Sequence, residues 1–231
     1  MEAKQKTKIY NLIVLDKSGS MSSIRTEAVN GYNETLGSIR ATQLKFIEDQ
    51  EHFVSLATFC GCGIQLVHDA VPIKDAQNLT RDQYRPCCRT PLYDAIGTSV
   101  NSIKNKLCPD SVAAVLVTII TDGEENSSRE WSLDSITQLI EEQKKAGWMF
   151  SFIGAGEDVL KAAESISITN TREWCKSAEG TALVLEEENE ARARFCRRLR
   201  NKLSSKMSQQ DKIEIMTSLS ESFYEGEDKE A

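Results

Sequence analysis

The chain has 231 residues, a net charge of −7 at pH 7 and a hydrophobic fraction of 40%. This length suffices for one α/β domain with a long final segment, and the acidic balance with scattered basic residues argues against a nucleic-acid partner. No stretch reaches the roughly 18 apolar residues of a membrane span, and Met1 to Lys8 lack the apolar region of a secretory signal. We therefore expect a cytoplasmic protein that does not bind membranes.

The first expected element is a strand at residues 9–15. Its apolar run is short and continuous, which is typical of a strand that is covered on both faces. It ends in Asp16, Ser18 and Ser20, which offer one carboxylate and two hydroxyls at alternate positions. Such hard oxygen donors suit a small hard cation such as Mg²⁺ or Mn²⁺. The alternative is that these side chains only cap the helix that follows.

A helix and a hairpin are expected next. Apolar residues recur at helical spacing at positions 24, 28, 32, 36 and 39. Residues 51–59 form an expected strand, and the glycine-containing turn after it leads into a second strand at 64–68. Residues 72–85 show no period, so we expect a loop there.

A Thr-Pro pair opens the following helix, whose apolar face runs from residue 92 to 107. Thr90 is therefore expected at the N-cap, with its side chain in the loop. Residues 112–120 form a second continuous apolar strand, and Asp122 follows it. Ligands bind at the carboxyl ends of strands in open α/β sheets, so Asp16, Thr90 and Asp122 are expected to meet at one edge.

The remaining chain alternates in the same way. We expect a helix from Ser132 to Gly147, a strand at 148–154, a helix at 158–166, a short edge strand at 173–175 and a helix at 180–203. This alternation predicts an α/β fold with a doubly wound, mostly parallel sheet. One domain should span residues 1–203. Residues 204–231 should form an extension, with a short helix at 212–219 and then an acidic, disordered tail.

Asp16-x-Ser18-x-Ser20, Thr90 and Asp122 together resemble the metal-ion-dependent adhesion site (MIDAS) of von Willebrand factor type A (VWA) domains, over roughly residues 8–200. The resemblance implies a Rossmann-like VWA fold in which residues 64–68 are the one antiparallel edge strand. It implies that Ser18 and Ser20 coordinate Mg²⁺ (or Mn²⁺ or Ca²⁺) directly, and that the other three residues do so directly or through water. The chain resembles stand-alone, cytosolic, bacterial-type members, but departs from the family pattern at Cys87-Cys88-Arg89.

Three functions are weighed against one another. The resemblance implies a non-enzymatic interaction module in which the Asp or Glu of a protein partner binds the cation. A metal-dependent hydrolase or phosphatase is the alternative, but Ser18 occupies the place of the second carboxylate of D-x-D phosphatases, and no histidine lies in the three metal-bearing loops. The third possibility is a structural domain without bound metal.

Two further features are open to more than one interpretation. The seven cysteines are an odd number in a chain without a secretory signal, so free thiols are expected. Zinc is the alternative for the Cys60/Cys62 and Cys87/Cys88 pairs, although their spacing is not C-x₂-C. The basic run at 192–200 follows an acidic run at 186–188, which favours a solvated helix over a phosphate-contacting face.

Overall fold

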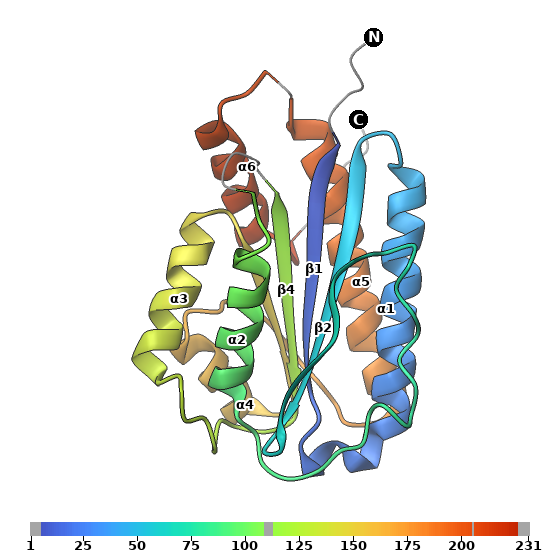
Figure 1. Cartoon of the computed structure of the whole chain (residues 1–231), viewed down its shortest axis with the longest axis vertical. Coiled ribbons are helices and arrows are strands. Elements are labelled where there is room, and N and C mark those ends of the chain that lie inside the picture. Colours follow the sequence, from blue (N-terminus) through green and yellow to red (C-terminus); the bar gives the residue numbers. More distant parts are fainter. Residues whose placement is uncertain (1–5, 109–112, 205, 226–231) are drawn as a thin grey trace.

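The computed structural model describes residues 6–108, 113–204 and 206–225 (Figure 1). Its six-stranded sheet has the order β3-β2-β1-β4-β5-β6. Every neighbouring pair is parallel except β2 and β3, so the predicted mostly parallel sheet with one antiparallel edge strand is confirmed. The strands are β1 (Thr7–Asp16), β2 (Gln50–Cys60), β3 (Gly63–Pro72), β4 (Ala114–Thr121), β5 (Met149–Gly154) and β6 (Asn170–Glu173).

Helices cover both faces of this sheet (Figure 1). Along β1, Leu12 and Val14 point into one apolar cluster, whereas Ile13 and Leu15 point into the other. A strand that is apolar on both faces is stable only when both are covered. One layer is formed by α2 (Leu92–Lys104), α3 (Leu133–Lys145) and α4 (Glu157–Ser165), and the other by α1 (Arg25–Lys45), α5 (Ala178–Lys202) and α6 (Gln209–Glu221).

Local signals explain where several helices begin and pack. The five apolar positions expected at helical spacing, 24, 28, 32, 36 and 39, are all buried; the last four lie in α1, and Ile24 directly precedes it. Ser132 caps α3, because its hydroxyl accepts the backbone N–H of Ser135 and the Ser135 hydroxyl accepts the N–H of Ser132. The helix expected after residue 158 begins at Glu157, and the one expected from 180 begins at Ala178.

The order of the strands places a crevice beside β1. From β1 the chain continues to β2 and β3 on one side, and then crosses to β4 on the other side of β1. Leu15 pairs with Ile120, so Asp16 lies beside Thr121 at the ends of the two strands. This is the topological switch point at which open α/β sheets bind ligands.

Two strands differ in their described bounds from those expected from the sequence. The short edge strand predicted at 173–175 lies earlier, at Asn170–Glu173, because its neighbour β5 ends at Gly154, whose carbonyl accepts the N–H of Trp174 as the last bond between the two strands. The strand predicted at 112–120 is β4, whose described part begins at Ala114, and residue 112 lies outside the described residues. The loop expected at 72–85 contains no regular element after β3.

The prediction of a solvated helix at 186–200 is wrong for one face of α5. Glu188 and Arg192 are only 1% and 3% exposed and form an ion pair of 3.1 Å. Thr118 and Ser151 of the sheet both donate to the Glu188 carboxylate. The sequence pattern misses this because the pair is one helical turn apart and points inward, between other charges that point to solvent.

The segment after residue 203 remains on the domain as far as residue 224. Helix α6 packs against α5 and β5, Phe223 is buried, and the Tyr224 hydroxyl donates to Glu188 at 2.6 Å. Residues 226–231 of the expected acidic tail lie outside the described residues. Among the helices that the structure describes, none has the length and apolar character needed to cross a membrane.

Candidate metal centre

Asp16 lies at the buried end of the site. It ends β1 and is 0% exposed. One carboxylate oxygen accepts the backbone N–H of Ser18 and the other accepts the hydroxyl of Thr121, each at 2.6 Å. The Tyr84 hydroxyl donates to the Asp16 backbone carbonyl, so the loop between β3 and α2 also holds the strand end. Asp16 is thereby fixed in position.

Ser18, Ser20 and Asp122 form a chain of polar contacts above it. The two serine hydroxyl oxygens lie 3.1 Å apart, and the Ser20 hydroxyl donates to the Asp122 carboxylate at 2.7 Å. Ser18 precedes the short helix η1 (Gly19–Ile24), but its side chain makes no capping hydrogen bond. Helix capping therefore does not explain why these two hydroxyls face the carboxylate.

Thr90 lies at the site, but it is not held there as the N-cap residue that the sequence predicts. The N-cap prediction is wrong, because α2 begins at Leu92 and Pro91 is its N-cap residue. Thr90 is held instead through its backbone, whose N–H donates to the Asn126 side chain at 2.9 Å and whose carbonyl accepts the Asn126 N–H at 3.1 Å. Its hydroxyl would lie 3.3 Å from a Cβ at Gly123, so it packs beside the residue that follows Asp122.

Lys176 is a member of the site that sequence reasoning missed. Its ammonium forms an ion pair with the Asp122 carboxylate and donates to the Ser20 carbonyl at 3.2 Å. The Asp122 side chain is 0% exposed, whereas that of Lys176 is 30% exposed. Lys176 lies between β6 and α5; the strand-end rule indicates this loop as one that faces the site, but it does not indicate which side chain of the loop reaches Asp122.

Burial raises the pKa of Asp16 to about 6. Its hydrogen bonds with Thr121 and Ser18 oppose this shift, and the charge of Asp122 adds to it. The neutral carboxyl is thus more stable in the folded chain than in the unfolded one, where the ordinary value is 3.8. The ionised carboxylate at neutral pH costs folding free energy unless a cation offsets it.

We expect Asp16→Asn to reveal this cost in EDTA. Between about pH 4 and pH 7 the Asp16 carboxyl loses its proton in the unfolded chain before it does so in the folded chain, which favours the unfolded chain. Over this range the free energy of unfolding of the parent protein should therefore fall by about 2–3 kcal/mol more than that of Asp16→Asn, which has no carboxyl at this position. His52, whose pKa burial and the charge of Arg192 lower to about 4, acts equally in both proteins. Urea unfolding at several pH values measures the difference, and a difference that does not change with pH would contradict this assignment.

The donor set fits a small hard divalent cation. The five predicted residues lie at one edge and supply two carboxylates and three hydroxyls, which are oxygen ligands of the kind that Mg²⁺ and Mn²⁺ accept. The Lys176 ammonium shows that Asp122 and the Ser20 carbonyl already bind a positive charge at this place. Sulfur and imidazole donors are absent from these five residues.

Solved structures with similar folds include proteins from two unrelated settings. The pilus adhesin SpaC from Lactobacillus rhamnosus GG, in an open conformation, superposes with a TM-score of 0.61 and 14% identity over 82% of this chain. Proximal thread matrix protein 1 from the mussel byssus gives a TM-score of 0.56 and 16% identity over 81% of the chain. The fold is that of a VWA domain.

These similarities concern the fold alone. The chain covers 30% of the adhesin and 47% of the thread matrix protein. A second structure of the thread protein, described as having a zinc-occupied MIDAS motif, has a TM-score of 0.53 at 14% identity, and the match covers 81% of this chain and 46% of that one. No protein-family model matches the sequence, and no curated protein sequence matches it.

Proposed function

We propose that this chain is a non-enzymatic protein-interaction module that binds an acidic residue of a partner through a divalent cation, Mg²⁺ in the first instance. Asp16, Ser18, Ser20, Thr90 and Asp122 would hold the ion. The observation that carries the proposal is the contact chain from Ser18 through Ser20 to Asp122, which unites residues about a hundred positions apart without any capping role. When bound, the ion would supply a Lewis-acidic position for a carboxylate.

The local charge around the site favours an acidic partner in spite of the net charge of −7. Lys17 and Arg89 lie in loops that carry candidate ligands, and Lys176 contacts Asp122 from the β6–α5 loop; Arg89 and Lys176 are exposed. Glu124 and Glu173 are exposed acids close in sequence to this group. Because screening limits the reach of a charge to about 10 Å at moderate ionic strength, these nearby residues matter more than the total.

None of the five candidate ligands gives the hydrolase alternative an exposed acid, because the side chains of Asp16 and Asp122 are both 0% exposed. Asp16 is the carboxyl with the raised pKa, but it is 0% exposed and both of its oxygens already accept hydrogen bonds. Both histidines lie elsewhere, His52 on β2 and His68 on β3, and each is buried. Assaying generic phosphate esters with the Mg²⁺-loaded protein separates this alternative from the interaction module.

A cytosolic location is part of the proposal. The described residues contain no disulfide, which is the state that a reducing compartment maintains. A domain of this size buries enough apolar surface to be stable without disulfides, which agrees with a reducing location.

Lys176→Ala should increase the affinity for Mg²⁺ about tenfold, because the ammonium competes with the ion for the Asp122 carboxylate. Lys106→Ala is the matched control, since Lys106 pairs with Asp69 at 2.8 Å away from this site. Isothermal titration calorimetry measures both. An unchanged or weaker affinity in Lys176→Ala alone would show that Lys176 supports the cation instead of competing with it.

Ser18→Ala combined with Ser20→Ala should abolish capture of the native partner without changing the circular dichroism spectrum. EDTA should release the same partner from the parent protein, because it removes the cation through which the domain is proposed to bind the partner. Affinity capture in Mg²⁺ and in EDTA, quantified by mass spectrometry, measures both effects. A partner retained at full affinity in EDTA would place the binding surface elsewhere on the domain.

A further inference from the structure

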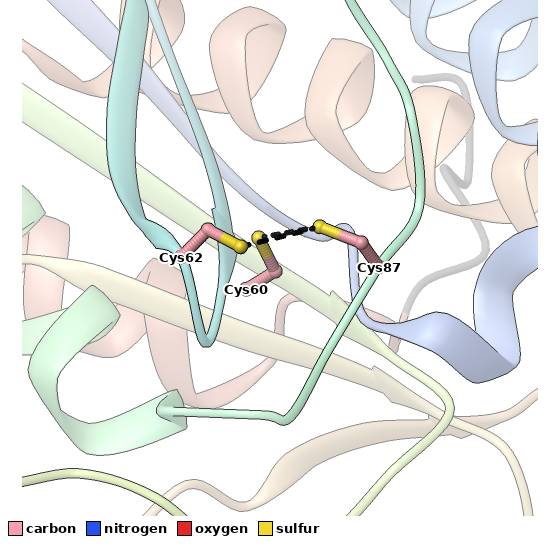
Figure 2. Close-up of side chains that lie close together, drawn as sticks. All are labelled: Cys60, Cys62 and Cys87. Atoms are coloured by element: carbon pink, nitrogen blue, oxygen red, sulfur yellow. Dashed lines mark hydrogen bonds between the residues drawn. The ribbon is translucent and has the colours of Figure 1, made fainter.

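Four of the seven cysteines meet beside the candidate metal centre. Cys60 ends β2 and Cys62 lies in the tight turn before β3, whereas Cys87 and Cys88 lie in the loop that leads to Thr90. The sulfurs of Cys60 and Cys87 lie 3.3 Å apart, those of Cys62 and Cys87 lie 3.7 Å apart, and those of Cys62 and Cys88 lie 3.1 Å apart. Figure 2 shows the side chains of Cys60, Cys62 and Cys87 with their sulfurs pointing toward one another.

The backbone holds these two loops together at close range. The Gly61 N–H donates to the Arg89 carbonyl at 2.8 Å, and a Cβ at Gly61 would lie only 3.1 Å from the Arg89 nitrogen and the Cys88 Cβ. Cys88 has a φ of 61°, a left-handed conformation that residues with a side chain seldom adopt. Such backbone strain persists where surrounding interactions impose it, and it concentrates at functional sites.

Three of the sulfurs, those of Cys60, Cys62 and Cys87, lie close enough together to bind one ion. Zn²⁺ binds thiolate sulfur at about 2.3 Å, so the sulfurs of a tetrahedral site lie about 3.8 Å apart. The Cys62–Cys87 distance of 3.7 Å is close to that value, and the distances of 3.3 Å and 3.1 Å would lengthen by about half an ångström on ion binding. All three far exceed the S–S bond of about 2.05 Å in a disulfide. All three sulfurs of Cys60, Cys62 and Cys87 lie within 4.8 Å of one another.

We propose that Cys60, Cys62 and Cys87 hold a single Zn²⁺ ion, separate from the oxygen-donor site, and that the exposed side chain of Cys88, whose sulfur lies 3.1 Å from that of Cys62, turns in as the fourth thiolate. Each thiol gives its proton to solvent as its thiolate binds the ion, and no electron transfer is involved. A zinc ion with four thiolates carries a net charge of −2, which the neighbouring Arg89 side chain offsets in part. Cys62 and Cys88 are exposed, so an ion can enter from solvent.

The two sites share a loop, which makes the zinc ion a brace for the oxygen site. The Cys88 carbonyl accepts the N–H of Gly19 at 3.1 Å, and the Cys87 N–H donates to the Lys17 carbonyl at 2.9 Å. Gly19 and Lys17 belong to the segment that carries Ser18 and Ser20. Zinc would thus fix the position of Thr90 relative to the serines. This coupling rests on the proposed function, whereas zinc binding itself does not.

The test begins with reduced, metal-free parent protein titrated with Zn²⁺ against a chromogenic chelator, and separately with Co²⁺. One zinc ion should bind per chain at the thiols. Co²⁺ should give sulfur-to-cobalt charge-transfer bands and the intense d–d bands of a tetrahedral site. Cys87→Ser should weaken zinc binding at least about 100-fold. Cys108→Ser, an exposed cysteine outside the cluster, should bind as the parent does.

Two further variants keep the outcomes distinct. Asp122→Asn should retain the cobalt–thiolate bands, because it alters only the oxygen site. Cys62→Ser should lose these bands. This result does not depend on whether the oxygen site binds Mg²⁺. The proposal is overturned if Co²⁺ shows no thiolate bands, or if zinc binding survives Cys62→Ser and Cys87→Ser but is lost in Asp122→Asn. It is also overturned if the cysteines pair as disulfides in the zinc-supplied protein, as peptide mapping would show.

Discussion

Asp122→Asn is expected to reduce the affinity for Mg²⁺ at least about 100-fold while the domain stays folded. Loss of an outer partner of a metal ligand already costs about 10–100-fold in affinity, so loss of a charged ligand should cost no less. The Asp122 carboxylate is 0% exposed and receives the Ser20 hydroxyl at 2.7 Å, so it lies where the candidate donors converge. Isothermal titration calorimetry with Mg²⁺ measures the change.

The fold should tolerate this substitution. Asparagine keeps the volume and an oxygen that can accept the Ser20 hydrogen bond, and Lys176, at 30% exposure, can turn to solvent. Removing the charge also relieves repulsion with Asp16, so the free energy of unfolding in EDTA should change by less than about 1 kcal/mol. Asp69→Asn, at a pair remote from the site, is the control. An unfolded Asp122→Asn protein would identify Asp122 as a structural anchor.

Glu188→Ala should cause the largest loss of stability, about 3–5 kcal/mol, because it leaves the buried Arg192 guanidinium without its acidic partner. The same substitution removes the acceptor for the hydroxyls of Thr118, Ser151 and Tyr224. Urea denaturation followed by circular dichroism measures the change in the free energy of unfolding.

Two neighbouring variants show whether burial causes this effect. Glu187→Ala removes an acid next in sequence whose side chain is 59% exposed and pairs with Arg172, so it should cost less than about 1 kcal/mol. Glu188→Gln keeps hydrogen-bonding atoms at the buried position and should fall between the two alanine variants. If Glu188→Ala costs no more than Glu187→Ala, the buried pair does not stabilise the sheet.

Most of the fold follows from periodicity and strand ends. Strand β1 and the strand that precedes Asp122 are apolar on both faces, and the helices between strands carry one apolar stripe, so the sequence predicts a doubly wound sheet. The rule that ligands bind at strand carboxyl ends then brings Asp16 and Asp122 together. The structure shows the two acids at neighbouring strand ends, while their ligation of a metal stays a prediction.

Features that depend on packing across the chain were beyond this reasoning. Lys176 reaches Asp122 only because the β6–α5 loop lies over the same edge. Glu188 is one of several acids in a row, and nothing local marks it as the buried one. The cysteine cluster joins two pairs separated by 24 intervening residues, and neither pair has a recognisable zinc spacing. In each case tertiary contacts, and not local sequence preference, set the outcome.

Water-proton relaxation with Mn²⁺ tests the central claim most directly. Bound Mn²⁺ that keeps an exchangeable water should enhance relaxation in the parent protein and not in Ser18→Ala with Ser20→Ala. Adding a short glutamate-containing peptide should lower the enhancement as its carboxylate displaces that water, whereas the matched glutamine peptide should not. Enhancement that is absent, or that persists unchanged at saturating glutamate peptide, would contradict a cation that binds an acidic partner.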